Sequence, residues 1–249
     1  MLTTVLSISV RPDRSSAYEA RVHRLADKAK AQQEPFEWAA YQTMAGTLGT
    51  VHFVSQCPDW ATLGAREPVE LLIRRLMGDT EGAQLIDQLN ECVGAQRFII
   101  GRDRPDLSYP PELNAPMRAL GMVTVFRCTP GGQDACEELI RKVAQAIPLV
   151  RDPRRVVAYQ TVVGDLRTYW AVTPLADLAE LDTILPPAEL LTKAFGAEGT
   201  LIHRTALDAI ERMDRQLTVL RPELSNATWL GSVVFPAVRP RAAAEQRAH

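Results

Sequence analysis

The sequence predicts an α+β protein made of two β-α-β-β-α-β units, whose antiparallel sheets pack on each other and close into one barrel within a single chain. Three observations lead to this prediction. The Ala-Tyr-Gln-Thr segment at 40–43, with a glycine three residues after it, returns about 118 residues later at 158–161. Arg-Pro-Asp-Leu-Ser at 104–108 returns as Arg-Pro-Glu-Leu-Ser at 221–225. Between these segments, both copies show the same succession of strand and helix patterns.

The length of this repeat indicates two domain-sized units, because the repeats of a solenoid run only about 20–50 residues. We place the first unit at 1–112, the second at 117–238, and a tail at 239–249. The proline-rich segment 110–116 between the units favours a stiff linker. The two units are expected to pack as a pseudo-twofold pair, which is an intramolecular counterpart of a dimer.

The first unit begins with a strand at 5–10, where apolar and polar side chains alternate. A helix follows, because Ser16 and Glu19 have the spacing of a capping box at a helix start. The remaining elements are a hairpin at 36–45 and 51–55, helices that begin at Asp59, Pro68 and Thr80, and a last strand at 97–100.

The second unit repeats this order and adds one strand. Residues 230–235 resemble 120–125 at the start of the unit, and we interpret them as an added C-terminal strand. Each unit is then a split β-α-β arrangement of the ferredoxin-like kind, with helices on one face of its sheet. The other sheet face needs a cover, which the second copy supplies. The second unit has strands at 123–126, 156–163, 168–172 and 217–220, and helices that begin at Asp134 and span 187–195 and 200–213.

Composition excludes several classes of function. The net charge of −2 and the pI near 6.1 give no basic footprint for a nucleic-acid partner. No run approaches the ~20 apolar residues of a membrane span, and the first residues have no signal-peptide pattern. The sequence therefore predicts a cytoplasmic protein. Its four cysteines lack C-x-x-C spacing, which favours reduced, packed thiols without a metal.

The strand order, the strand-to-helix turns at 55–63 and 173–181, and the two Arg-Pro-Asp/Glu-Leu-Ser segments resemble the dimeric α/β-barrel superfamily. The sequence resembles in particular proteins with an antibiotic-biosynthesis-monooxygenase-like (ABM-like) domain, here in tandem duplication over 3–109 and 121–225. The resemblance implies a small-molecule protein that binds an apolar or aromatic ligand between sheet and helices. It also implies a cofactor-independent monooxygenase if the protein is an enzyme. The alternatives are a non-catalytic binding or scaffold protein and a heme-binding protein.

Four residues are candidates for a ligand pocket, while the catalytic residues stay unassigned. His52 lies in mid-strand, at the position that corresponds to Trp170 in the second copy. It is either a general base near neutral pH or a histidine bonded to polar neighbours. Trp38 and Trp170 line either a pocket or the core. His203 lies on a helix of the second copy, either as a surface side chain or, as the resemblance suggests, as a heme ligand.

Tyr41 and Tyr159 occur in both copies, which favours a structural role at the interface between the two sheets. A ligand site is instead expected to use unmatched residues such as His52 and to occupy one half. We expect no cofactor and no metal. A further homodimer of the whole chain is left open.

Overall fold

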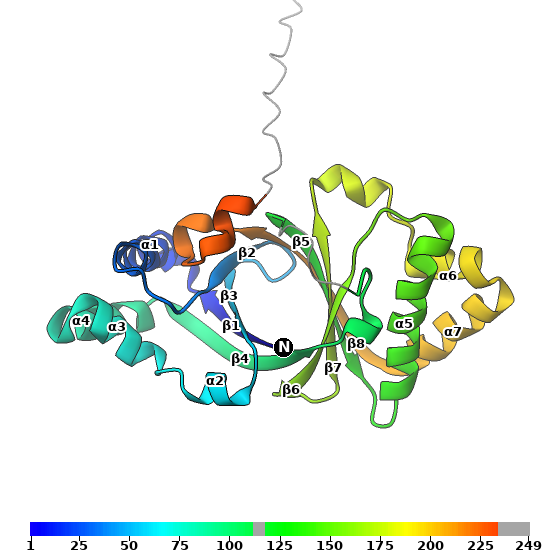
Figure 1. The fold of residues 1–249 in the computed structure, drawn as a ribbon, viewed down its shortest axis with the longest axis horizontal. Helices are drawn as coiled ribbons and strands as arrows, with labels where there is room; N and C mark the ends of the chain where they lie inside the picture. Colours follow the sequence, from blue (N-terminus) through cyan, green and yellow to red (C-terminus); the bar gives the residue numbers. More distant parts are fainter. Residues whose placement is uncertain (112–117, 234–249) are drawn as a thin grey trace, which may run out of the picture.

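The computed structural model describes residues 1–111 and 118–233. Eight strands form a closed antiparallel barrel in the order β1-β3-β2-β8-β5-β7-β6-β4, so the predicted antiparallel barrel is confirmed. In Figure 1 the strands form a ring between two outer layers of helices. The strands are β1 (Leu2–Val10), β2 (Ala39–Ala45), β3 (Thr50–Cys57), β4 (Val93–Asp103), β5 (Leu120–Cys128), β6 (Val157–Val163), β7 (Thr168–Leu175) and β8 (Ile210–Leu220).

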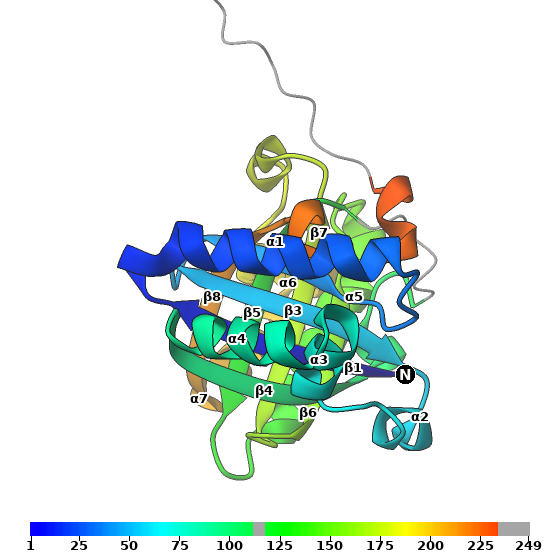
Figure 2. The same cartoon turned by 90° about the vertical axis from the view of Figure 1, so that its left-hand side faces the viewer.

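The helices lie on the outside of the barrel, in one layer from each part of the chain. Figure 2 shows α1, α3 and α4 lying across the outer face of the strands of the first part. The apolar cores therefore lie between sheet and helices, in clusters such as Leu25, Leu72 and Leu85 on one side, and Leu139, Ile147 and Leu190 on the other. The helices are α1 (Ser15–Ala31), α2 (Trp60–Gly64), α3 (Val69–Met77), α4 (Asp79–Asn90), α5 (Gln133–Val150), α6 (Pro187–Phe195) and α7 (Ala197–Asp208), with 3-10 turns η1 (Pro12–Arg14), η2 (Pro105–Leu107), η3 (Leu178–Asp182), η4 (Pro222–Leu224) and η5 (Thr228–Ser232).

Two predicted elements near the end of the chain are wrong. The added strand at 230–235 is not formed over its described part, because residues 228–232 are the 3-10 turn η5. The ring of strands is already closed, and Trp229 and Leu230 instead pack on Leu220 beside the β2–β8 join. The helix predicted at 200–213 ends at Asp208, because the backbone from Ile210 onward pairs with β5. The tail at 239–249 and residues 112–116 of the predicted linker lie outside the described residues.

The barrel closes at two joins between the early and the late strands. At one join Tyr41 of β2 pairs with Leu220 of β8. At the other, Asp103 of β4 pairs with Tyr159 of β6. Both tyrosines of the repeated segment therefore lie at a join, where each half of the barrel meets the other.

The segment after β4 binds the second half of the chain. The Arg104 guanidinium donates to Glu137 on α5 at 2.7 Å and to Gln160 on β6 at 3.0 Å. The Ser108 hydroxyl accepts the backbone N–H of Ala158 at 3.0 Å, and Leu107 is fully buried. The end of the first half is thus anchored on the second.

The segment after β8 makes the reciprocal contacts with the first half. Arg221 donates to Glu19 on α1 at 2.9 Å and to the side chain of Gln42 on β2. Ser225 accepts the N–H of Ala40 at 2.9 Å. Glu19 therefore binds Arg221, and the predicted capping box is wrong, since α1 begins after Arg14 without a side-chain cap. We call these two sets of contacts, by residues 104–108 and 221–225, the reciprocal clasp.

Removing either clasp hydroxyl should destabilise the protein. Ser108→Ala or Ser225→Ala leaves the buried N–H of Ala158 or Ala40 without a partner, which costs about 1–3 kcal/mol. Urea unfolding followed by circular dichroism measures this change in the free energy of unfolding. Ser232→Ala, at an exposed position, is the control. Equal stability of all four proteins would contradict the role of the clasp.

Separate expression of the two halves tests the same contacts on a larger scale. Fragments 1–112 and 117–249 each lack the partner segment for their clasp and leave half of the barrel uncovered. We expect them to be insoluble alone or to associate when co-expressed, as size-exclusion chromatography would show. Two well-behaved, independent monomers would contradict the intramolecular barrel.

Candidate functional site

The interior of the barrel contains a cavity of about 510 Å³, which we call the barrel chamber. Alternate residues of a strand point to the same face, so one face of each strand packs on helices and the other lines this chamber. Its walls combine valine and aromatic side chains with threonine, serine and glutamine side chains, and its described lining includes no acidic residue. The apolar wall residues include Val5, Val54, Ile99, Val123, Val125, Val157 and Val172, and the aromatic ones include Tyr41, Tyr159 and Trp170.

The aromatic side of the chamber is formed by Trp170 and Tyr159, whose ring centroids lie 5.9 Å apart. Gly101 gives the indole its space, because a Cβ at this position would lie 3.0 Å from the Trp170 ring. Burial raises the pKa of Tyr41 to about 12, and it also raises the pKa of Tyr159. Both phenols are therefore protonated near neutral pH, when they can donate hydrogen bonds.

His52 faces the chamber with both ring nitrogens engaged. Nδ1 lies 2.8 Å from the Ser7 hydroxyl, and Nε2 lies 3.1 Å from the Thr43 hydroxyl. Burial lowers the pKa of His52 to about 4, so the ring is neutral near pH 7. A neutral imidazole bonded on both sides is a weak base for a ligand. The geometry therefore matches a histidine held by polar neighbours, which is the second of the two sequence-based interpretations.

The opposite wall lacks this polar arrangement. Trp170 occupies the position that corresponds to His52, and Thr161 corresponds to Thr43. The Thr161 hydroxyl oxygen is buried and has no hydrogen-bond partner among the described residues. Because the second copy has an indole where the first has an imidazole, one side of the chamber is polar and the other is apolar.

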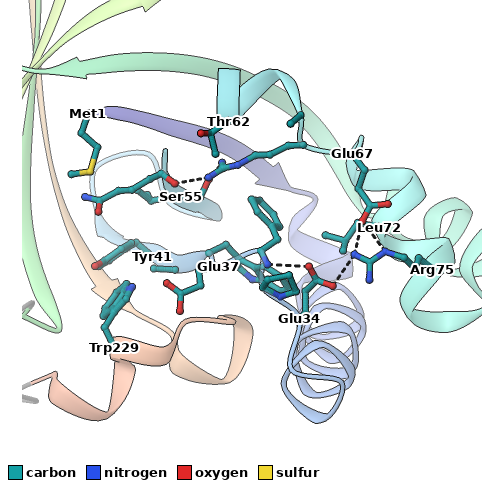
Figure 3. Close-up of a pocket in the computed structure, with 18 residues that line it drawn as sticks. Met1, Glu34, Glu37, Tyr41, Ser55, Thr62, Glu67, Leu72, Arg75 and Trp229 are labelled. Atoms are coloured by element: carbon teal, nitrogen blue, oxygen red, sulfur yellow. Dashed lines mark hydrogen bonds and ion pairs between the residues drawn. The ribbon is translucent and has the colours of Figure 1, made fainter. Parts of the chain in front are cut away.

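A second hollow of about 910 Å³, the outer pocket, lies outside the barrel between β2–β3, α2–α3 and η5 (Figure 3). Its charged groups already bind one another or the protein. Arg66 lies over the Phe36 ring at 5.0 Å and donates to Ser55 at 2.9 Å. Arg75 binds Glu34 at 2.7 Å and Glu67 at 2.5 Å.

The sequence-predicted residues are divided between these places. His52 and Trp170 line the chamber together with Tyr41 and Tyr159, so matched and unmatched residues share one cavity. Trp38 lines the outer pocket but is only 7 % exposed, and its indole N–H donates to the Leu224 carbonyl at 2.9 Å. His203 lies on α7 and lines neither hollow.

Sequence reasoning missed three arginines that line the chamber: Arg97, Arg118 and Arg155. Arg97 lies on β4, whereas the other two lie just before β5 and β6. The only signal for Arg97 is its two-residue spacing from Ile99 on the inner face of β4. No spacing in the sequence connects the two loop arginines.

The sequence matches no family model and no curated protein. Solved structures with the same arrangement do exist. A putative monooxygenase from Lactobacillus acidophilus NCFM has a TM-score of 0.53 at 6 % identity, covering 91 % of this chain and 95 % of that chain. An anthrone oxidase-like protein has a TM-score of 0.53 at 14 % identity, covering 88 % and 91 %. The chlorite dismutase of Candidatus Nitrospira defluvii, in complex with imidazole, has a TM-score of 0.51 at 10 % identity, covering 89 % and 91 %.

These structures belong to the dimeric α/β-barrel superfamily, and the predicted resemblance is confirmed at the level of the fold. The chain has the dimeric α/β-barrel fold. At such low identity the likeness is one of fold alone, and activities belong to the site.

Other predicted features concern the membrane, metals and thiols. Within residues 1–111 and 118–233, no helix has the length and apolar character needed to cross a membrane. In the same described part of the chain, no three His, Cys, Asp or Glu side chains are grouped to hold a metal ion. Cys57, Cys92, Cys128 and Cys136 are buried and unpaired.

The burial of His52 predicts a loss of stability at low pH. The folded-state pKa of about 4 lies below the unfolded value of about 6.5. Between these values the unfolded chain binds a proton that the folded protein does not, so the free energy of unfolding falls as pH falls. His52→Asn should reduce this fall by on the order of 2 kcal/mol. Urea unfolding of both proteins near pH 7 and near pH 4.5 measures the difference, and identical pH profiles would contradict it.

Proposed function

We propose that the protein binds an apolar or aromatic small molecule in the barrel chamber. The hollow apolar interior of the closed barrel is the observation that carries this proposal. Its volume of about 510 Å³ lies within the range of about 300–1,000 Å³ common for ligand pockets. Its polar lining residues include Ser7 and His52 on one wall, where His52 is also hydrogen-bonded to Thr43. The outer pocket is the weaker candidate, because its arginines already have protein partners.

We also propose that the chain is a tandem duplication of an ABM-like domain, with ferredoxin-like units at 1–112 and 117–238. The strand order supports this, since β4-β1-β3-β2 and β8-β5-β7-β6 have the same connectivity in the two parts of the ring. The repeated segments and their reciprocal contacts support it as well. One chain would then form the barrel that other members of the superfamily build from two.

Within that superfamily, the geometry favours a binding role over catalysis. A cofactor-independent monooxygenase is the alternative, since monooxygenases share the fold. A general base works best when its pKa lies near the operating pH, whereas the pKa of His52 is lowered to about 4. Oxygen consumption in the presence of a bound ligand would favour the enzymatic alternative.

The chamber does not fit heme held by histidine. His52 is the only histidine of its described lining, and both ring nitrogens are hydrogen-bonded to hydroxyl groups. His203, the other candidate, lines neither hollow. A hemin titration should therefore show no Soret shift, and a stoichiometric shift would favour the heme-binding alternative.

Binding of a neutral aromatic probe tests the chamber directly. We expect 2-naphthalenemethanol to bind the wild-type protein and to change its tryptophan fluorescence through Trp170. Val123→Phe fills part of the chamber and should weaken binding about tenfold or more. Val69→Phe, on the exposed surface of α3, is the matched control.

Thermal melting of each variant shows whether the fold is retained. Equal affinity of the Val123→Phe and Val69→Phe proteins would contradict binding in the chamber. Native mass spectrometry of protein purified from its own host would then identify the natural ligand.

A further inference from the structure

The charged side chains in the described lining of the barrel chamber are all positive. Its described lining includes Arg97, Arg118 and Arg155 but no aspartate or glutamate. His52 is neutral, and the wall between the two open ends of the barrel, which we call its mouths, has apolar residues such as Val123 and uncharged polar residues such as Ser7. A ligand that lies along this chamber therefore meets cationic side chains at Arg118 and Arg155, next to the strand ends, and at Arg97 on β4.

Two of these arginines lie at the same mouth of the barrel. Arg118 lies two residues before β5, and Arg155 lies two residues before β6. Both strands pair with β7, where Gly121 faces Pro174 and Val157 faces Val172. The two arginines therefore flank β7 at one end of the barrel. Arg97 lies farther along, toward the opposite end, because it pairs with Ser7 of β1.

The two guanidinium groups differ in their contacts. Arg118 donates to Glu180 at 2.8 Å, and the second carboxylate oxygen of Glu180 accepts the Ala176 N–H at 2.9 Å. Arg155 has no hydrogen bond or ion pair with any described residue, although its neighbour Arg154 binds Asp152 at 2.7 Å. Donors at this mouth are therefore available to a ligand.

We propose that the chamber takes a monocarboxylate with an apolar or aromatic body, and that Arg155 and Arg118 hold its carboxylate. This inference rests on the proposed ligand binding in the chamber. A guanidinium presents two parallel N–H groups that match a carboxylate. Among the described lining residues and their ion-pair partners, Arg118, Arg155 and Glu180 leave about one net positive charge at this mouth, which matches a monoanion better than a dianionic phosphate. The apolar body lies against Trp170 and the valine walls.

A pair of probes with the same ring system tests this assignment. We measure the binding of 2-naphthoate and 2-naphthalenemethanol to the full-length protein by isothermal titration calorimetry. The acid should bind about tenfold more tightly than the alcohol, and high salt should reduce only the affinity of the acid. Arg155→Gln should reduce acid affinity to that of the alcohol and leave alcohol binding unchanged. Arg118→Gln should act in the same direction.

Arg102→Gln is the matched control, because Arg102 is exposed on β4 and does not line the chamber. If Arg118→Gln impairs folding, Arg155→Gln alone decides the outcome. Equal binding of both probes, unaffected by Arg155→Gln, would overturn the carboxylate assignment while chamber binding stands. Loss of the acid preference in Arg97→Gln alone would place the carboxylate at the opposite mouth and also overturn it. Failure of both probes to bind the folded protein would contradict both proposals.

Discussion

The reciprocal clasp is the interaction on which the closed barrel depends. Each join pairs a strand of one half with a strand of the other, and each is followed at once by a clasp segment. Arg104 and Arg221 cross to an acid on the first long helix of the other half, Glu137 and Glu19. Leu107 and Leu224 are buried beneath these contacts, at 0 % and 1 % exposure. The joins hold the apolar inner faces of the two halves together, so the chamber exists only while both are closed.

The clasp also explains which residues the two halves share. Ala40 and Ala158 donate their N–H groups to clasp serines, and Gln42 and Gln160 accept from clasp arginines. These contacts stabilise closure and say nothing about a ligand. Chamber residues are under no such constraint, which allows an imidazole on one wall and an indole on the other. The residues that the two halves share thus account for the fold, while the residues that differ make the two walls of the chamber unlike each other.

The sequence could predict the barrel because strand alternation and the repeat are local or regular signals. It could not show that each repeated segment binds the other copy, since matching residues predict similar environments but not exchanged partners. The helix predicted at 200–213 failed because pairing with β5 outweighs the helical preference of residues 210–213. The sequence predicts a structural role for Tyr41 and a ligand-site role for His52. Both side chains line one cavity, because the inner faces of neighbouring strands converge. Arg118 and Arg155 lie in loops, where no periodicity indicates which way a side chain points.

Closure of the barrel also limits how a ligand can reach the chamber. Backbone pairing at both joins leaves no gap between strands there, so entry has to occur through a mouth. Tyr41, Val54 and Gln56 line both the chamber and the outer pocket, so the two hollows share a wall. Gln56 pairs with Thr3 at the end of β1 and β3 nearest the N-terminus, the same end at which β5 and β6 begin. A ligand that enters through this mouth brings its carboxylate to Arg155 and Arg118, while its apolar body reaches Trp170. The cationic mouth would therefore attract and orient an anion before apolar contacts form, with the body leading into the barrel and the charge left at the rim.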